Sequence, residues 1–263
     1  MSASNQADGK PYRQESQPYG DARRALAPTD EEIAGMPLRN NAEIAGELLA
    51  GSRPRVLDVG CGDGTFTRQF ATLHHGRLAG IDIQERKIEK ARAAAAAAGV
   101  AIEFHKASAE AMPFADSSFD VVMFSNSLHH MADIDLALRE AVRVLAPGGL
   151  LCIMEPVPAG SYFEASKLVN DETAVRTEAY HAIGQAIASG LLPLREVRYR
   201  SRRRISSFDE WREDEIDRDE KRRAAFVAQP EMVRAQFEKH AQREDGFFVF
   251  DQVRRVNLLR KDD

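Results

Sequence analysis

Residues 56–67 read VLDVGCGDGTFT, an apolar run followed directly by a turn that contains three glycines. Glycine accepts positive φ angles and lets a ligand approach the backbone closely. A turn between a buried strand and a helix lies at the carboxyl end of the strand, where doubly wound α/β sheets bind their ligands. The free amides at the start of the helix favour an anion, so we expect Gly60, Gly62 and Gly64 to face the anionic part of a ligand.

Short apolar runs alternate with helical patterns along the chain, at residues 55–59, 77–81, 101–104, 119–124 and 150–154. Buried strands separated by helices predict a parallel sheet that is covered on both faces. Two later strand candidates, residues 194–204 and 246–259, are expected to form an antiparallel pair at one sheet edge. The sequence therefore predicts a Rossmann-like, doubly wound α/β fold with a mostly parallel seven-stranded sheet, helices on both faces and an antiparallel last strand.

Several helices of this pattern have recognisable ends. Residues 30–50 have roughly helical apolar spacing and predict one or two helices before the first strand. Six consecutive alanines, residues 93–98, stop at Gly99, because alanine is the best helix former and glycine commonly ends a helix. A helix over residues 133–145 is expected to lead into the fifth strand through the turn at residues 147–149.

Composition excludes several classes of protein. A net charge of -5, with 43% hydrophobic residues, gives no general electrostatic reason to bind nucleic acid or an anionic membrane. Cys61 and Cys152 lack CxxC or Cys/His spacing, so neither a disulfide nor a metal site is indicated. The polar N-terminus lacks a secretory signal, and no stretch reaches the roughly 18 apolar residues of a membrane span. We expect a cytoplasmic protein without a resident metal.

The spacing of the glycines distinguishes between nucleotide ligands. A dinucleotide fingerprint requires a third glycine where this chain has Thr65, whereas Asp58, Gly60 and Gly62 form the pattern DxGxG. Asp82 ends the second expected strand, where an acidic side chain can accept both ribose hydroxyls of a nucleoside. Two strand ends are thus predicted to converge on one nucleoside ligand, and a nicotinamide-dependent oxidoreductase remains as the outside alternative.

Five ordered motifs, VLDVGCGDG, GIDI, AEAMPFADSSFDVV, SNSLHH and RVLAPGG, lie within about residues 55–156. They resemble the successive motifs of class I S-adenosylmethionine-dependent methyltransferases, and the style of PFADSSFDVV and RVLAPGG is similar to the ubiquinone and menaquinone C-methyltransferase-like branch. The resemblance implies S-adenosyl-L-methionine as the cofactor and S-adenosyl-L-homocysteine as its product.

The resemblance also implies which residues hold the methionine part of the cofactor. The backbone of Gly60, Cys61 and Gly62 would approach it, and Asp58 would act nearby on its amino group through water. Ser125, after the fourth expected strand, would lie beside the same amino group. Cys61 is interpreted as a small packing residue rather than a nucleophile, since no base partners it in the sequence.

The nucleoside part of the cofactor is expected at the next strand ends. The resemblance implies that Asp82 holds the ribose and that Ile83 packs against adenine. Ala109 would offer a backbone amide to the base, and Glu110 would lie close by. Related sequences often carry aspartate where this chain has Ser108, so the polar contact with the adenine amino group differs here.

Methyl transfer from a sulfonium is an in-line displacement with a good leaving group, so alignment and desolvation supply much of the acceleration. An acceptor that loses a proton benefits from a general base, and histidine suits this role near neutral pH. We take His129 as the catalytic candidate; with His130 it follows the fourth expected strand, in a place similar to the base of plant-type O-methyltransferases. The alternative is a packing histidine. Glu155, Tyr180 and His181 are weaker candidates.

The stretch LREVRYRSRRR, residues 194–204, contains six arginines, which suit an anionic substrate or a phosphate backbone. An acidic run at residues 209–220 follows it, so an internally compensated surface is the simpler interpretation, and nucleic acid is not the expected partner. His105, on or just after a central strand, is expected to be buried and hydrogen-bonded.

Domain organisation follows from these patterns. Residues 1–28 are polar and predict a flexible N-terminal arm, in which Tyr12 and Tyr19 are placed to fold over a ligand. Residues 29–263 are expected to form one domain, with the helical segments 156–190 and 207–243 shaping and covering the acceptor site. No pattern indicates an oligomeric state.

The leading functional hypothesis is a methyltransferase acting on an O, N or C atom of a small molecule. The alternatives are transfer to RNA or protein and a non-catalytic protein that only binds S-adenosylmethionine. The acceptor itself is not indicated, because fold-level analogy does not identify a substrate.

Overall fold

The computed structural model describes residues 26–49, 54–73 and 76–262. Its strands are β1 (Arg55–Val59), β2 (Arg77–Asp82), β3 (Glu103–Lys106), β4 (Phe119–Ser125), β5 (Leu145–Pro156), β6 (Leu192–Ile205), β7 (Gln242–Glu244) and β8 (Phe247–Arg260). Its helices are α2 (Asp30–Gly35), α3 (Asn41–Leu48), α4 (Thr65–Ala71), α5 (Glu85–Ala97), the 3₁₀ helix η1 (Leu128–His130), α6 (Ile134–Val144), α7 (Ser161–Ser166), α8 (Thr173–Ala188), α9 (Phe208–Glu215), α10 (Glu220–Ala228) and α11 (Pro230–His240).

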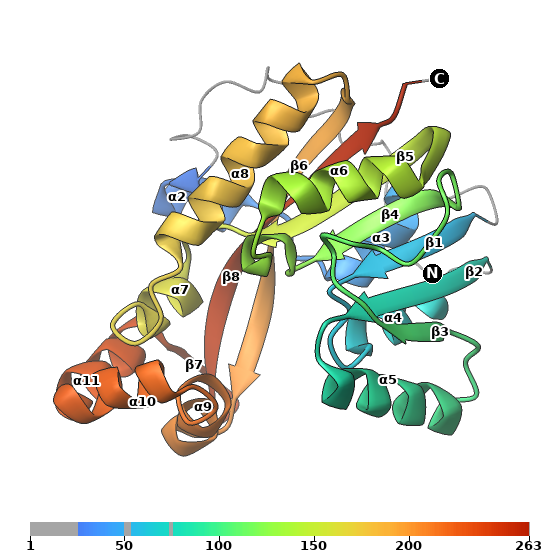
Figure 1. Cartoon of the computed structure of the whole chain (residues 1–263). Helices are drawn as coiled ribbons and strands as arrows, with labels where there is room; N and C mark the ends of the chain where they lie inside the picture. Colours follow the sequence, from blue (N-terminus) through green and yellow to red (C-terminus); the bar gives the residue numbers. More distant parts are fainter. Residues whose placement is uncertain (1–25, 50–53, 74–75, 263) are drawn as a thin grey trace, which may run out of the picture.

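These strands form one eight-stranded sheet in the order β3-β2-β1-β4-β5-β8-β6, with β7 paired to β8 (Figure 1). Strands β1 to β5 are mutually parallel, whereas β8 runs antiparallel to both of its neighbours, β5 and β6. The predicted parallel sheet and the antiparallel pair at its edge are confirmed. The three-residue strand β7 is an addition to the seven expected strands, and it was missed because so short a segment carries no alternation.

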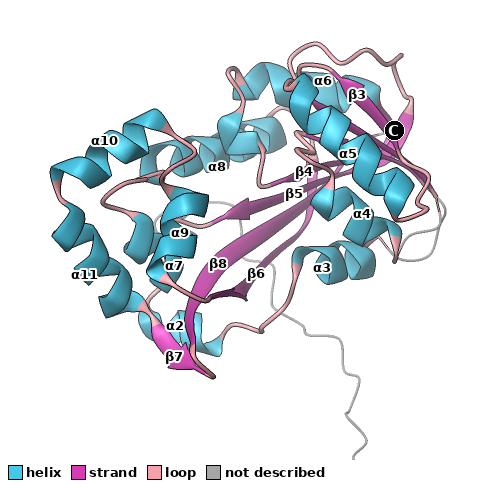
Figure 2. Cartoon of the chain, turned by 90° about the horizontal axis from the view of Figure 1, so that it is seen from below, coloured by secondary structure: helices cyan, strands magenta, loops and turns pink. Residues whose placement is uncertain are grey.

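Helices cover both faces of the sheet (Figure 2). On one face, α3 and α4 pack against β1, β4 and β8 through side chains such as Ile44, Phe70 and Met123. On the other face, α6 and α8 pack against the same strands through Leu138, Ile183 and their neighbours. Helix α8 therefore belongs to the body of the fold, although it lies in the segment 156–190 that was expected to cover the acceptor site.

A third apolar core lies beyond the carboxyl edge of the parallel strands. The last partner of β5 in β8 is Arg254, but β8 begins seven residues earlier in the chain and pairs with β6 as far as Ile205 and Phe248. The β6–β8 ribbon thus projects past the sheet, and α7, α9 and α11 pack around it (Figure 1). The fully buried Trp211 and Phe237 lie in this core.

Helix α6 ends at Val144, close to the expected end, but residues 147–149 lie within strand β5 and do not form the expected turn. The left-handed Gly148 and a register shift against β4 mark this stretch as an irregular part of the strand. The end of helix α5 is found where the sequence placed it. Helix α5 ends at Ala97 and is followed by Gly99 in a left-handed conformation (φ 65°). The predicted N-terminal arm, with Tyr12 and Tyr19, falls almost entirely outside the described residues. No helix in the described part of the chain is long and apolar enough to cross a membrane.

Candidate functional site

The glycine turn after β1 lies at the carboxyl edge of the sheet. Gly60 (φ 72°), Gly62 (φ 58°) and Gly64 (φ 70°) have left-handed backbone angles that favour glycine. A Cβ atom at Gly60 would lie 2.6 Å from the Cβ atom of Ser127, so no side chain fits there. A Cβ atom at Gly62 would meet no atom of the described chain within 4 Å. At Gly60 the turn packs closely against Ser127, whereas at Gly62 its backbone is open to a ligand.

Asp58, near the end of β1, is a buried carboxylate in which only one oxygen has a hydrogen-bond partner. Its Oδ2 atom accepts a hydrogen bond of 2.6 Å from the hydroxyl of Thr67, whereas its buried Oδ1 atom has no hydrogen-bond partner among the described residues. Burial raises the pKa of Asp58 to about 7; the Thr67 bond opposes this change, and the charge of Asp82 adds to it. An unpartnered buried oxygen is rare in native proteins and fits a site that receives an amino group or a water molecule.

Asp82 ends β2 and ties the glycine turn to the next helix. Its Oδ2 atom accepts the amide N–H of Gly62 at 3.0 Å, and its Oδ1 atom accepts that of Gln84 at 2.8 Å. Each carboxylate oxygen can accept a second bond, so Asp82 retains capacity for ribose hydroxyls.

Burial raises the pKa of the Cys61 thiol above its ordinary value, and the charge of Asp58 adds to this, which suits a packing role for Cys61.

The expected adenine side of the site lies after β2 and β3. Ile83 leaves 66% of its surface exposed, so its apolar side chain is available to a base, and Ala109 is buried in the loop after β3. Glu110 accepts the backbone amide of Ala132 at 2.9 Å and the hydroxyl of Ser108. Glu110 therefore ties this loop to the segment before α6, a structural role that the sequence did not indicate.

Ser125 ends β4 and contacts helix α3. Its Oγ atom accepts a hydrogen bond of 3.4 Å from the side chain of Asn41, whose Oδ1 atom in turn accepts one from Tyr199 on β6 at 2.8 Å. The next residue, Asn126, has a left-handed backbone (φ 56°), so the chain turns sharply at the end of β4. Helix α3 thus reaches the same sheet edge as the expected cofactor residue Ser125.

His129 and Glu155 form a buried pair at the ends of β4 and β5. The Nδ1 atom of His129 contacts the Oε2 atom of Glu155, and each side chain is only 2% exposed. The Oε1 atom of Glu155 accepts the amide N–H groups of Ser127 and Leu128, both at 3.0 Å. This fixed carboxylate favours a proton on Nδ1, which leaves Nε2 of a neutral His129 as a proton acceptor.

Ser127 joins this pair to the glycine turn. Its hydroxyl donates to the carbonyl of Val59 at 2.6 Å, its Cβ atom borders Gly60, and its amide donates to Glu155. The candidate base and the glycine turn therefore meet within one short segment.

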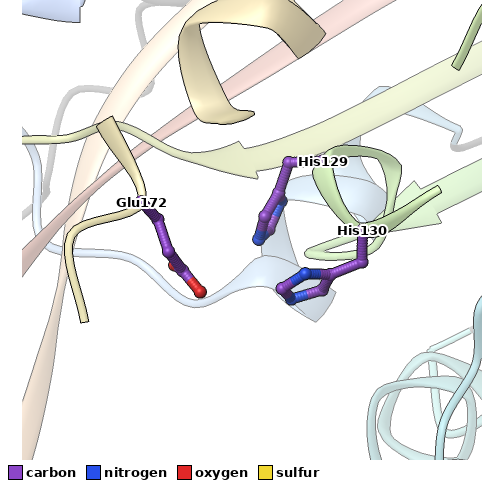
Figure 3. Close-up of side chains that lie close together, drawn as sticks. All are labelled: His129, His130 and Glu172. Carbon is purple, nitrogen blue, oxygen red and sulfur yellow. The ribbon is translucent and has the colours of Figure 1, made fainter. Parts of the chain in front are cut away.

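His130 and Glu172 complete a cluster with His129 (Figure 3). One ligand-type atom of each residue lies within 4.8 Å of the others, a spacing suited to a metal ion. Glu172, however, is paired with Arg176 at 2.5 Å and faces Arg222 at 3.6 Å. A metal ion would compete with these two guanidinium groups for the carboxylate, which disfavours metal binding here. Burial and the neighbouring His129 lower the pKa of His130 below its ordinary value, so the neutral form is favoured.

Three side chains considered from the sequence lie elsewhere than expected. His105 is 44% exposed at the side chain and lies 4.0 Å from Glu103, so the prediction that it is buried was wrong; β3 is the edge strand and leaves it uncovered. His181 is exposed on α8. Tyr180 packs under Arg255 on the sheet face and donates to Glu196.

The arginine stretch is compensated by acidic partners, as predicted, although most of these partners were not the expected ones. Arg203 pairs with Asp214 of the acidic run at 3.5 Å. The other pairs that can be described use the β7–β8 hairpin instead, because β6 is hydrogen-bonded to β8: they are Arg200 with Asp251, Arg202 with Glu244 and Asp251, and Arg204 with Asp245.

The doubly wound sheet, the DxGxG turn and the acidic end of β2 together define the fold of a class I S-adenosylmethionine-dependent methyltransferase. Residues 51–215, more than half of the 263, match the family model of a methyltransferase domain. The chain belongs to this methyltransferase-domain family.

Two curated relatives come from different branches of the family. A 27-O-demethylrifamycin SV methyltransferase from Amycolatopsis mediterranei is 39% identical over 131 residues, covering 48% of this chain and 48% of the relative. The ubiquinone/menaquinone biosynthesis C-methyltransferase UbiE from Hahella chejuensis is 35% identical over 146 residues, covering 50% of this chain and 59% of the relative. The chain thus spans about half the length of the curated relatives it matches.

Solved structures extend the likeness to the whole fold. A protein from Bacillus halodurans, described as a methyltransferase, matches with a TM-score of 0.62 and 22% identity, over 85% of this chain and 99% of that one. The [4+2]-cyclase SpnF matches with a TM-score of 0.55 and 22% identity, over 88% of this chain and 91% of that one. A shared fold at this identity does not specify the reaction.

Proposed function

We propose that this chain is an S-adenosylmethionine-dependent methyltransferase that methylates an oxygen atom of a small molecule, with His129 as the general base. The observation that carries the proposal is the buried His129–Glu155 pair, which Ser127 connects to the glycine turn. An oxygen acceptor gains most from such a base, because its hydroxyl must lose a proton as it gains the methyl group.

The cofactor residues are proposed as the sequence indicated them. The unpartnered Oδ1 atom of Asp58 and the open backbone of Gly62 fit the methionine part, with Gly60, Cys61 and Ser125 around it. Asp82 fits the ribose, and Ile83, Ala109 and Glu110 border the base. S-adenosylmethionine, when bound, supplies an electrophilic methyl group on a sulfonium.

The residues of the chain then have distinct tasks. Glu155 holds the Nδ1 proton of His129 and keeps the imidazole in one orientation. The Nε2 atom of His129 takes the proton of the acceptor hydroxyl and forms an imidazolium ion, which the negative charge of Glu155 stabilises. We infer that α7 and α9–α11, on the projecting ribbon, cover the acceptor, while α8 supports the sheet.

The relatives support a small-molecule acceptor. The rifamycin methyltransferase and the ubiquinone biosynthesis O-methyltransferase of Sinorhizobium fredii, 35% identical over 99 residues, are both named for such substrates. Carbon methylation is the second candidate, because the UbiE relatives are named C-methyltransferases. The acid-paired arginines of β6 give no support to a nucleic-acid partner.

Calorimetric titration with S-adenosylmethionine and S-adenosylhomocysteine tests the cofactor assignment, in parallel with Asp82→Ala. The control is Asp116→Ala, which removes an exposed carboxylate paired with Arg143, away from the glycine turn. Both ligands should bind the wild type and the control, and Asp82→Ala should weaken binding at least tenfold. A folded wild-type chain that binds neither ligand, even with candidate acceptors present, would overturn the proposal.

A further inference from the structure

Arg254, on β8, is a partly buried arginine whose hydrogen bonds all go to neutral groups. Its Nε atom donates to the hydroxyl of Ser201 at 3.1 Å, and one Nη atom donates to Gln252 at 2.9 Å. The other Nη atom donates to the side-chain oxygen of Asn126. No carboxylate of the described chain lies within ion-pair distance of Arg254, in contrast to its neighbours on β6.

The surroundings of Arg254 leave its charge and part of its hydrogen-bonding capacity available. A guanidinium group has five N–H donors, and the described chain accepts from three of them. Burial lowers the pKa of Arg254; the charges of Arg176 and Arg203 add to this effect, whereas those of Tyr199 and Glu155 oppose it. Because no carboxylate of the described chain contacts the guanidinium directly, an anionic partner in contact with it would stabilise the buried charge.

Arg254 lies at the same end of β5 as the candidate base. In the sheet it lies opposite Pro156, the last residue of β5, one residue beyond Glu155. The next residue, Arg255, stacks on Tyr180 of α8, so alternation directs Arg254 to the other face, toward α3 and Asn126. Arg254 and the His129–Glu155 pair therefore flank the carboxyl end of β5 from opposite faces.

We propose that Arg254 forms an anion-binding subsite of the acceptor site, so that the molecule methylated by this chain carries a carboxylate. The two remaining N–H donors suit such a group, because guanidinium and carboxylate pair in a bidentate, charge-assisted manner. This inference rests on the proposed function for the identity of the acceptor. The anion site itself does not depend on catalysis.

The carboxylate bound by Arg254 could also belong to the cofactor, and the affinity for S-adenosylhomocysteine distinguishes this from an acceptor carboxylate. If Arg254 pairs with the carboxylate of the methionine part, Arg254→Gln weakens binding of S-adenosylhomocysteine. If Arg254 pairs with the acceptor, that affinity stays within about threefold of the wild type. Glutamine keeps hydrogen-bonding capacity without the charge.

The experiment is calorimetric titration of the chain with benzoate and with benzamide, which differ in charge but hardly in shape. It is run with and without saturating S-adenosylhomocysteine. Wild type should bind benzoate at least tenfold more tightly than benzamide, and Arg254→Gln should bind both equally. The control Arg202→Gln, whose arginine already has Glu244 and Asp251 as partners, should keep the wild-type preference.

Asn126→Asp provides a second test should Arg254→Gln fail to fold. It places a carboxylate of nearly the same shape against the guanidinium, so it should abolish the preference for benzoate. The inference is overturned if the wild type binds benzoate and benzamide equally, or binds neither at millimolar concentration. It is also overturned if the preference for benzoate survives both substitutions. A loss of S-adenosylhomocysteine binding in Arg254→Gln also overturns it, in favour of the cofactor carboxylate. Because benzoate is also titrated without cofactor, failure of the methyltransferase proposal is seen separately.

Discussion

The Nδ1 atom of His129, on the 3₁₀ helix that follows β4, contacts the Oε2 atom of Glu155 near the end of the neighbouring parallel strand β5. Twenty-six residues separate them in the chain. Parallel strands bring such residues together because all their carboxyl ends lie at one sheet edge. Backbone amides hold Glu155 on one side, and under the proposed function the Nε2 atom of His129 accepts the proton of the acceptor on the other.

His129→Gln should lower kcat for methyl transfer by about 10² to 10⁴, the usual range for loss of a general base. The affinity for S-adenosylhomocysteine should stay within about threefold if His129 acts on the acceptor, as proposed. Steady-state kinetics and calorimetry measure the two quantities. His181→Gln, an exposed histidine on α8, serves as the matched control. An unchanged kcat in His129→Gln would remove the base from the mechanism.

Glu155→Gln should be almost as damaging as His129→Gln, although it removes only a charge. The Oε1 atom of glutamine can still accept the amides of Ser127 and Leu128, but its NH₂ group would then face Nδ1 and favour the opposite tautomer. Nε2 would carry the proton and could not accept another. The double variant should be no slower than the slower single variant, since residues that act as a unit are not additive. Multiplicative effects would show that the two residues act separately.

Asp58→Asn should change the pH dependence of stability. Burial raises the pKa of Asp58 from 3.8 to about 7, so between these values the folded chain holds a proton that the unfolded chain has lost. Stability therefore falls as the pH rises through this window and levels off above it. Asparagine cannot ionise, so Asp58→Asn should be more stable than the wild type at pH 8 by about 1 to 3 kcal/mol. At pH 4 the two should be nearly equal.

Urea unfolding at pH 4, 6 and 8 measures this difference, with Asp116→Asn as the exposed control. The same ionisation should appear in ligand binding: affinity for S-adenosylhomocysteine should rise with pH up to about 7 in the wild type and stay flat over that range in Asp58→Asn. A wild type whose stability is flat between pH 5 and 7 would contradict the raised pKa.

The parallel sheet and the conformation of the glycine turn were predictable because their determinants are local. Residues 56–67 contain the strand, the left-handed glycines and the helix start in one stretch, and Asp82 ends the next strand. The antiparallel β6–β8 pair was also predictable from its two long strand patterns.

The surroundings of His129 and Arg254 were less predictable, because their contacts join distant segments. Glu155 and His129 were each considered as candidates, but their pairing depends on the register of β4 and β5. Arg254 meets Asn126 across 128 residues, and Glu172 lies in a loop without any motif. The burial of His105 was predicted wrongly for a related reason. Strand order makes β3 an edge strand, and the pattern of a single strand does not show its position in the sheet.

Gly60→Ala and Gly62→Ala should separate packing from ligand access. Both positions have positive φ angles, so alanine costs each roughly 1 kcal/mol of strain. At Gly60 the new Cβ atom would also lie 2.6 Å from that of Ser127, whereas at Gly62 it would point into open space. Gly60→Ala should therefore lose clearly more thermal stability. Gly62→Ala should fold but bind S-adenosylhomocysteine at least tenfold more weakly. Normal binding by Gly62→Ala would place the cofactor elsewhere.

Phe237→Leu should affect the acceptor more than the cofactor if α7 and α9–α11 cover the acceptor site. Phe237 is fully buried in the third core, with the rings of Trp211, Phe248 and Phe250 at 5.0, 4.8 and 5.0 Å. Leucine leaves part of that space empty and loosens the helices on the ribbon, at a cost of about 1 to 3 kcal/mol. KM for the acceptor should rise several-fold while S-adenosylhomocysteine affinity is unchanged. Phe70→Leu, at a fully buried position under the sheet, is the matched control. Equal effects of both variants on KM would mean that the third core only stabilises the fold.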